Sequence, residues 1–147
     1  MKKRNVMLFA LAMFSCAATG VKGMEDVGAV YYVTLESGPK FQFSIDSSGL
    51  LDLKGKGITT RDLNTILRAI IERGDCGLVR MLFLAGNQLS ELPPQIGELV
   101  NLEGLSLRGN QLSEFPPQIG ELVNLKGLDV ARNQLTELPP QIGELVY

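Results

Sequence analysis

The chain of 147 residues contains no histidine and no tryptophan, and it has only two cysteines. Without histidine it cannot form a Ser-His-Asp or Cys-His catalytic arrangement, nor a zinc site that uses imidazole ligands. Aromatic residues make up only 6% of the chain, so few large rings are available to anchor an interface. The sequence therefore predicts a protein that is not an enzyme and that has neither a cofactor nor a metal site.

The chain also lacks an excess of positive charge. Its formal net charge is −2, and loss of the basic residues Lys2, Lys3 and Arg4 with a leader would change this to −5. Nucleic-acid binding depends on a basic surface that neutralises phosphates. We therefore expect no nucleic-acid partner.

The N-terminus has the pattern of an export signal. The three basic residues precede an apolar run over 6–14 and small residues over 15–18. This run is shorter than the roughly 20 residues that a membrane-spanning helix needs. We predict a signal peptide over 1–18 and a linker over 19–26, which makes the mature protein secreted, periplasmic or attached to the cell surface.

Cys16 leaves an alternative to simple cleavage open. Residues 13–16 resemble a degenerate bacterial lipoprotein box, although Met13 and Phe14 depart from the usual leucine and small residue. The resemblance implies that Cys16 would be lipidated, and that lipid would be the chain's means of membrane attachment. The other cysteine, Cys76, precedes Leu99 by 23 residues, so we expect it to be buried and unreactive.

Three units of 23 residues occupy 79–147, and all three contain a close version of NQLSELPPQIGELV. Seven apolar positions of the first unit recur as apolar residues in the second and third units. They are Val79, Leu82, Leu84, Leu89, Leu92, Ile96 and Leu99. The alternation around Leu82 and Leu84 predicts strands over 82–84, 105–107 and 128–130, stacked in parallel about 4.8 Å apart.

Each predicted strand is followed by an asparagine and then by two prolines. Asn87, Asn110 and Asn133 have short amide side chains that can bond the backbone of a tight turn, so we predict a structural asparagine ladder. The prolines at 93–94, 116–117 and 139–140 exclude strands and favour extended chain with short helical turns. Glycines at 97, 120 and 143 are expected to keep those turns short.

The pattern LxxLxLxxNxLxxLPxxIxxL is similar to the repeat of typical leucine-rich-repeat proteins, including Ras-suppressor-like scaffolds and many bacterial proteins. The resemblance implies a curved solenoid used mainly for protein–protein recognition. We therefore predict an α/β solenoid, a short right-handed leucine-rich-repeat coil with a parallel concave β-sheet, an N-terminal β-hairpin cap and one helix-bearing repeat.

Residues before the regular units divide into two parts. Over 27–50, apolar and polar residues alternate on both sides of Ser37-Gly38-Pro39, which predicts the hairpin cap. Over 51–78, a longer first repeat contains a helical stripe opened by Thr59 or Thr60 and closed by Gly74. The stripe consists of Leu63, Ile66, Leu67, Ile70 and Ile71. The three regular repeats over 79–147 complete this division of the chain.

Differences between the units concentrate on the strands, as expected if the strand face varies for a partner. Its candidate protein-binding residues are Met81, Phe83, Arg108 and Asp129, while Arg80, Glu103 and Lys126 are expected to compensate one another's charge. We predict an exported or surface-attached, non-catalytic protein-binding module, able to self-associate through its C-terminal repeat. The alternatives are an intracellular scaffold or signalling adaptor, and a truncated remnant of a longer repeat array.

Overall fold

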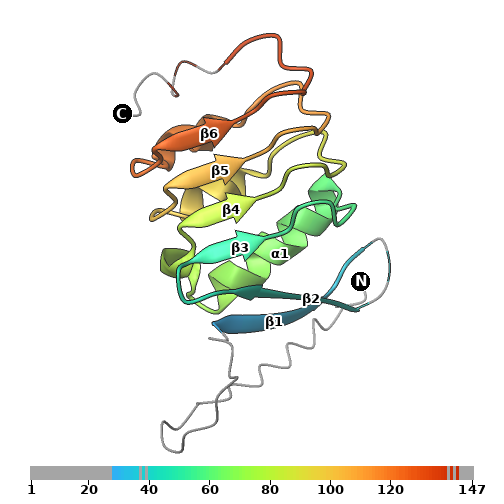
Figure 1. Ribbon diagram of the computed structural model, residues 1–147, viewed down its shortest axis with the longest axis vertical. Coiled ribbons are helices and arrows are strands. Elements are labelled where there is room, and N and C mark those ends of the chain that lie inside the picture. The colour runs from blue at the N-terminus through green and yellow to red at the C-terminus, as the bar shows by residue number, and fades with distance from the viewer. Residues whose placement is uncertain (1–27, 37, 39, 139, 141, 143–147) are drawn as a thin grey trace, which may run out of the picture.

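The computed structural model describes residues 28–36, 38, 40–138, 140 and 142. The predicted leader over 1–18, the linker over 19–26 and Cys16 lie outside these residues. Within them, six strands form one sheet in the order in which they occur along the chain (Figure 1). The strands are β1 (Ala29–Thr34), β2 (Lys40–Ile45), β3 (Leu50–Asp52), β4 (Met81–Phe83), β5 (Gly104–Ser106) and β6 (Gly127–Asp129).

The sheet changes from antiparallel to parallel at β3. Strands β1 and β2 form an antiparallel hairpin, and β2 pairs with β3 through Ile45 and Leu51. From β3 to β6 the pairing is parallel and in register. The helical segments lie on the other side of each coil, and they are α1 (Thr60–Glu72), η1 (Cys76–Leu78), η2 (Pro94–Glu98) and η3 (Pro117–Glu121). The chain thus has a repeat fold in which successive coils stack along the sheet.

Strands β4 to β6 lie one residue earlier than the sequence pattern predicts. The Leu84 amide still donates to the Ser106 carbonyl at 2.8 Å. The Leu84 carbonyl, however, accepts hydrogen bonds from two asparagine side chains instead of from a neighbouring strand. The regular ladder therefore ends at Phe83, although the Gly86 amide still donates to the Arg108 carbonyl at 2.8 Å.

The core follows the repeated apolar positions, and its coverage changes along the stack. In the first two regular coils these side chains are at most 7% exposed. In the third coil Leu128, Val130 and Leu135 are only partly buried, and Leu138 is 53% exposed. Each coil packs on its neighbours, so the described part of the third coil has less apolar surface covering it than the coils before it.

Helix α1 occupies the position predicted by its apolar stripe. Thr59 begins it with a capping box, in which the Asp62 amide donates to Thr59 Oγ1 and the Asp62 carboxylate accepts from the Thr59 amide. The stripe residues are buried except for Ile71, which is partly exposed. Gly74 follows the helix with a φ of +74°, a conformation that favours glycine.

A cluster around Tyr31 joins the hairpin to the segment after α1. The Tyr31 ring stacks on Phe43 with 4.6 Å between centroids, and its hydroxyl donates to Asp75 Oδ2 at 2.6 Å. The Arg73 guanidinium lies 4.4 Å above the Tyr31 ring and pairs with Asp75 at 3.1 Å. Burial, and then the bond to Asp75, raise the pKa of the Tyr31 hydroxyl, so it stays a neutral donor.

Cys76, which we expected to be buried, is only partly buried. It packs against the core but remains partly exposed in η1, the short turn that follows α1 within the longer helix-bearing coil. Its surroundings therefore differ from those of Leu99 and Leu122, which are fully buried in regular coils. The pKa of the Cys76 thiol is still raised, first by partial burial and then by the charge of Glu98, so the less reactive thiol form is favoured.

Candidate binding face of the sheet

The pairing register arranges the outward-facing residues of the parallel strands in columns. One column contains Leu50, Met81, Gly104 and Gly127, and the next contains Asp52, Phe83, Ser106 and Asp129. Both columns run across the same face of the sheet shown in Figure 1, because alternate residues of a strand share a face. The structure therefore places three of the predicted site residues, Met81, Phe83 and Asp129, in two adjacent columns.

Met81 lies across the neighbouring strand at Gly104. A Cβ atom at Gly104 would stand 2.7 Å from Met81 Sδ, so a larger residue there would displace the flexible end of the Met81 side chain. At Gly127, the next position in the column, a Cβ atom would meet nothing within 4 Å. A flexible apolar side chain thus borders an open floor over β6, where the backbone of a partner could approach closely.

Arg108 joins this face through a contact with Asp129. Its Nη1 atom lies 3.9 Å from Asp129 Oδ2, and the two side chains are 49% and 44% exposed. Asp129 Oδ1 also accepts from the Ala131 amide at 3.0 Å, which fixes the carboxylate. An exposed ion pair at this distance contributes little stability, so both groups remain available to a partner.

The face also includes residues of β3 that the sequence prediction did not assign to it. Leu50 and Asp52 continue the two columns, and Lys54 follows at the position of Ala85, as the bond from the Gly55 amide to the Ala85 carbonyl shows. The available signal was the spacing of Leu51 and Leu53, which matches that of Leu82 and Leu84. The same spacing predicts that the residues flanking Leu51 face outward like those flanking Leu82, and this adds a fourth strand to the face.

The predicted asparagine ladder lies beside the core and links each coil to the one before it. Asn110 Oδ1 accepts from the Leu89 amide at 3.1 Å, and its Nδ2 donates to the carbonyls of Leu84 at 3.0 Å and Leu107 at 2.8 Å. Asn87 and Asn133 occupy the corresponding places in the adjacent coils. These side chains hold the strand ends in position and do not form part of the exposed face.

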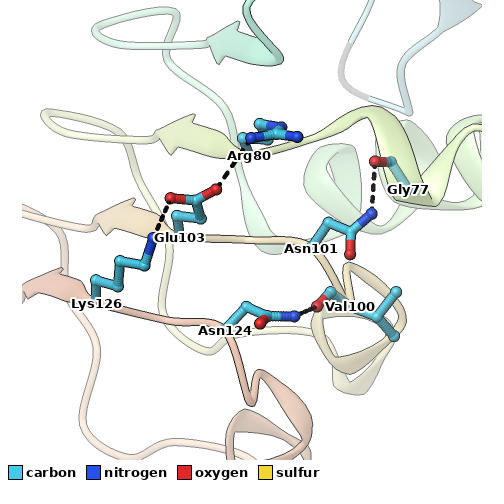
Figure 2. A network of polar contacts seen from close by, with 7 residues as sticks. All are labelled: Gly77, Arg80, Val100, Asn101, Glu103, Asn124 and Lys126. Carbon is cyan, nitrogen blue, oxygen red and sulfur yellow. Dashed lines mark hydrogen bonds and ion pairs between the residues drawn. The ribbon is translucent and has the colours of Figure 1, made fainter. Parts of the chain in front are cut away.

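A row of charges crosses three coils just before their strands (Figure 2). Glu103 Oε1 lies 3.2 Å from Arg80 Nη1, and Glu103 Oε2 lies 2.7 Å from Lys126 Nζ. The hydrogen bond and charge of Lys126, followed by the charge of Arg80, lower the pKa of the Glu103 carboxyl. The carboxylate thus bridges two cations on adjacent coils, which supports charge compensation within the row.

A second asparagine row, beside the charge row in Figure 2, was not predicted as a functional feature. Asn101 Nδ2 donates to the Gly77 carbonyl at 2.9 Å, and Asn124 Nδ2 donates to the Val100 carbonyl at 2.8 Å. Both bonds reach back to the preceding coil. The signal for this row was the recurrence of asparagine at a 23-residue interval, as in the ladder itself.

Among the described residues, no three acidic or cysteine side chains gather in a way that could hold a metal ion. No helix of the described chain has the length and apolar character needed to cross a membrane.

Comparison with known proteins supports the interpretation of the repeats. Residues 100–143 match the family described as leucine-rich repeats, in two copies. A comparison with curated proteins finds no match. The matched segment contains β5, η3 and β6, which belong to the second and third of the regular 23-residue coils.

Proposed function

We propose that the chain, whose residues 100–143 match leucine-rich repeats, is a protein-interaction module that binds a protein partner through the exposed face of the sheet and catalyses no reaction. In this proposal the repeats form a right-handed solenoid and the face is concave. The mature protein acts outside the cell that makes it, after removal of residues 1–18 or lipidation of Cys16.

The observation that carries the proposal is the composition of the face. Phe83 and Met81 offer apolar contact area beside the open floor at Gly127, while Arg108 and Asp129 offer charges held by only a weak ion pair. Phenylalanine, methionine and arginine are all enriched at protein–protein interfaces relative to the rest of the surface. Together they give a partner an apolar anchor and a polar contact at the same place.

The experiment is affinity capture with the purified chain and a Phe83→Ala/Arg108→Ala double variant, using surface extracts of cells that meet the protein. Matched controls are Val123→Ala and Arg68→Ala, which shorten an exposed apolar residue and an exposed arginine elsewhere. We expect the double variant to lose a partner that both controls and the unaltered chain retain. Equal capture by all four proteins would refute the role of the face.

Export has a separate test. Mass spectrometry of the N-terminus of the mature protein should reveal either cleavage near Ala18 or a lipid on Cys16. The intracellular scaffold is the competing function, and recovery of the chain only from the cytosol with residues 1–18 intact would establish it instead.

A second candidate interaction is self-association, because the third coil exposes apolar side chains that are buried in the first two. Leu138 is 53% exposed, whereas its counterparts Leu92 and Phe115 are at most 7% exposed. We propose that these side chains of the third coil contact a second copy of the chain. Sedimentation velocity should show a mass that rises with concentration, and Leu138→Glu should abolish the rise. A concentration-independent monomer would contradict this proposal without affecting capture through the sheet face.

A further inference from the structure

The sheet has an open edge at the hairpin end of the stack. Strand β1 stands first in the strand order, and among the described residues it pairs only with β2 (Figure 1). Its six residues, AVYYVT, include no proline and no charged side chain, and all six pair with β2 without a bulge. Edge strands are usually protected from other chains by charges, prolines, bulges or short length. Strand β1 itself has none of these protections.

A hydrogen bond of β2 shows which way the backbone groups of the hairpin point. The Asp46 amide, directly after β2, donates to the Leu50 carbonyl of β3 at 3.1 Å. Backbone groups alternate in direction along a strand, so those of Ile45 point the other way, toward its partner Ala29 in β1. Every second residue of β1 after Ala29 therefore directs its N–H and C=O groups away from β2.

These outward residues are Val30, Tyr32 and Thr34. The Val30 carbonyl accepts from Arg73 Nη1 at 3.0 Å, a bond from outside the sheet that agrees with this direction. Within the described part of the chain, no backbone hydrogen bond reaches Tyr32 or Thr34 from beyond the hairpin. Both residues therefore present an unused donor and an unused acceptor at the edge of the sheet.

We propose that two copies of the chain pair antiparallel through their β1 strands, so that their sheets join across a twofold axis at Val33. Tyr32 of one copy then lies opposite Thr34 of the other, and each such pair exchanges two hydrogen bonds. Identical edges can satisfy each other because both copies supply the same donors and acceptors. This contact goes beyond the proposed function, because it involves neither the binding residues of the sheet face nor the third coil, which lies at the opposite end of the stack (Figure 1).

The bond from Arg73 selects this register over its nearest alternative. A twofold axis at Tyr32 would place Val30 opposite Thr34, and the Val30 carbonyl would then have to release Arg73. The Arg73 guanidinium is also held by the buried tyrosine cluster, so its release would be costly. With the axis at Val33, the bonds between copies involve only Tyr32 and Thr34, and Arg73 stays in place.

The charges at the ends of the contact are complementary. In this register Glu36 of one copy lies beside Val30 of the other, where Arg73 is bound. Glu36 is available because its ion pair with Arg61 spans 4.0 Å and its side chain is 62% exposed. The twofold axis repeats the same contact at the other end. A second copy therefore supplies both the strand and the carboxylates that this edge can accept.

The test uses the full chain with Leu138→Glu, which removes contact through the third coil. A contact between two short strands is at the weak end of interface sizes, so we expect half-association at about 0.1–1 mM, above the concentrations of a sedimentation run. ¹H–¹⁵N NMR over this range should show shifts of the Tyr32 and Thr34 amides and about fivefold slower exchange with solvent as concentration rises. The Tyr31 and Val33 amides, which already bond β2, should keep their exchange rates.

Two pairs of variants in the same background identify the contact. Thr34→Pro removes an outward N–H without breaking a bond to β2 and should abolish association, whereas Thr34→Val keeps that N–H and should associate normally. Glu36→Lys places a cation beside Arg73 of the second copy and should weaken association about fivefold. Arg61→Gln removes the partner of Glu36 within one copy and should have no such effect.

Circular dichroism verifies that each variant is folded, and Glu36→Lys decides the result if Thr34→Pro is not. Tyr32 and Thr34 amides that do not respond up to about 1 mM would overturn the proposal. Protection of these amides that is already complete at the lowest concentration would also overturn it, because the edge would then be covered within a single copy. Association that Glu36→Lys leaves unchanged would exclude the proposed register.

Discussion

Asparagine occurs at two positions in the first and second regular coils, and these positions differ in burial and in the number of bonds they make. Asn110 is 7% exposed and makes three hydrogen bonds, whereas Asn101 is exposed and makes one. Water can replace the partner of an exposed amide, but it reaches a buried group poorly. The stack should therefore depend on the ladder much more than on the second asparagine row.

Alanine substitution in the second coil tests this difference directly. Asn110→Ala leaves the buried Leu89 amide without its acceptor and removes one of the two asparagine donors from the carbonyls of Leu84 and Leu107, so we expect a loss of about 3 kcal/mol in the free energy of unfolding. Asn101→Ala should cost about 0.5–1 kcal/mol because its amide is exposed. Urea denaturation followed by circular dichroism measures both. Similar losses for the two variants would show that the buried ladder stabilises the fold no more than the exposed asparagine row does.

Arg132 has a left-handed backbone conformation, and the equivalent position of the first two regular coils is glycine. Its φ is +58°, and the equivalent residues Gly86 and Gly109 have φ of +68° and +67°. A side chain in this region costs about 1–2 kcal/mol, part of which is offset because glycine loses more entropy on folding. We expect Arg132→Gly to stabilise the chain by roughly 0.5 kcal/mol. Thermal melts measure this change. Arg132→Ala retains a Cβ atom and should give no gain in stability. If alanine stabilised the chain as much as glycine, the backbone at Arg132 would not be strained.

At the scale of elements, the charge row connects three coils independently of the sheet. Because Lys126 and Arg80 lower the pKa of Glu103 in the folded state, its ionisation stabilises that state above the unfolded-state pKa. This contribution is lost as pH falls through the lower, folded pKa. The melting-temperature difference between the unaltered chain and Glu103→Gln should therefore be positive near pH 7, shrink below about pH 4.5 and decrease in high salt.

A matched variant identifies the cause of this pH dependence. Lys126→Met removes the strongest partner of Glu103, so NMR titration of the Glu103 carboxyl should give a pKa closer to its ordinary value. Arg61→Met, in the weaker contact with Glu36, should leave that pKa unchanged. If Glu103 titrates at the same pH with and without Lys126, the row does not couple the coils.

The elements with a strong local period were predictable from the sequence, and those that depend on contacts between distant segments were less so. The stripe of Leu63, Ile66 and Ile70 defines α1 because each buried side chain recurs on one face of a helix. The predicted end of β4 was wrong because the Leu84 carbonyl accepts from asparagine side chains. The spacing of apolar residues gives no information about these bonds.

The candidate face was predicted only in part for the same reason. Met81 and Phe83 follow from strand alternation, since their neighbour Leu82 is an obvious core residue. The contact between Arg108 and Asp129 depends on the register of adjacent coils. The 23-residue period predicts this register, but it does not predict the distance between the two side chains. The contact of Met81 with Gly104 was not predicted. It depends on the conformation of a flexible side chain, which neither composition nor repeat period determines.

At the scale of the whole molecule, contacts join mainly neighbouring coils, so stability should vary along the stack. Equivalent amides report each step: those of Leu53, Leu84 and Leu107 donate at 2.8 Å to Phe83, Ser106 and Asp129 of the following coil. Leu107 depends on the third coil, whose apolar side chains are the least covered of the described regular coils. In such linear arrays the least covered unit opens first.

Native-state hydrogen exchange tests this order, and we expect the Leu107 amide to exchange at least tenfold faster than those of Leu84 and Leu53. Asn133→Ala should accelerate Leu107 further, because Asn133 Nδ2 donates to the Leu107 carbonyl at 3.0 Å and holds the third coil in place. The Leu53 amide lies three coils away and should keep its rate. One common rate for all three amides, shifted equally by the substitution, would instead mean that the chain opens as a single cooperative unit.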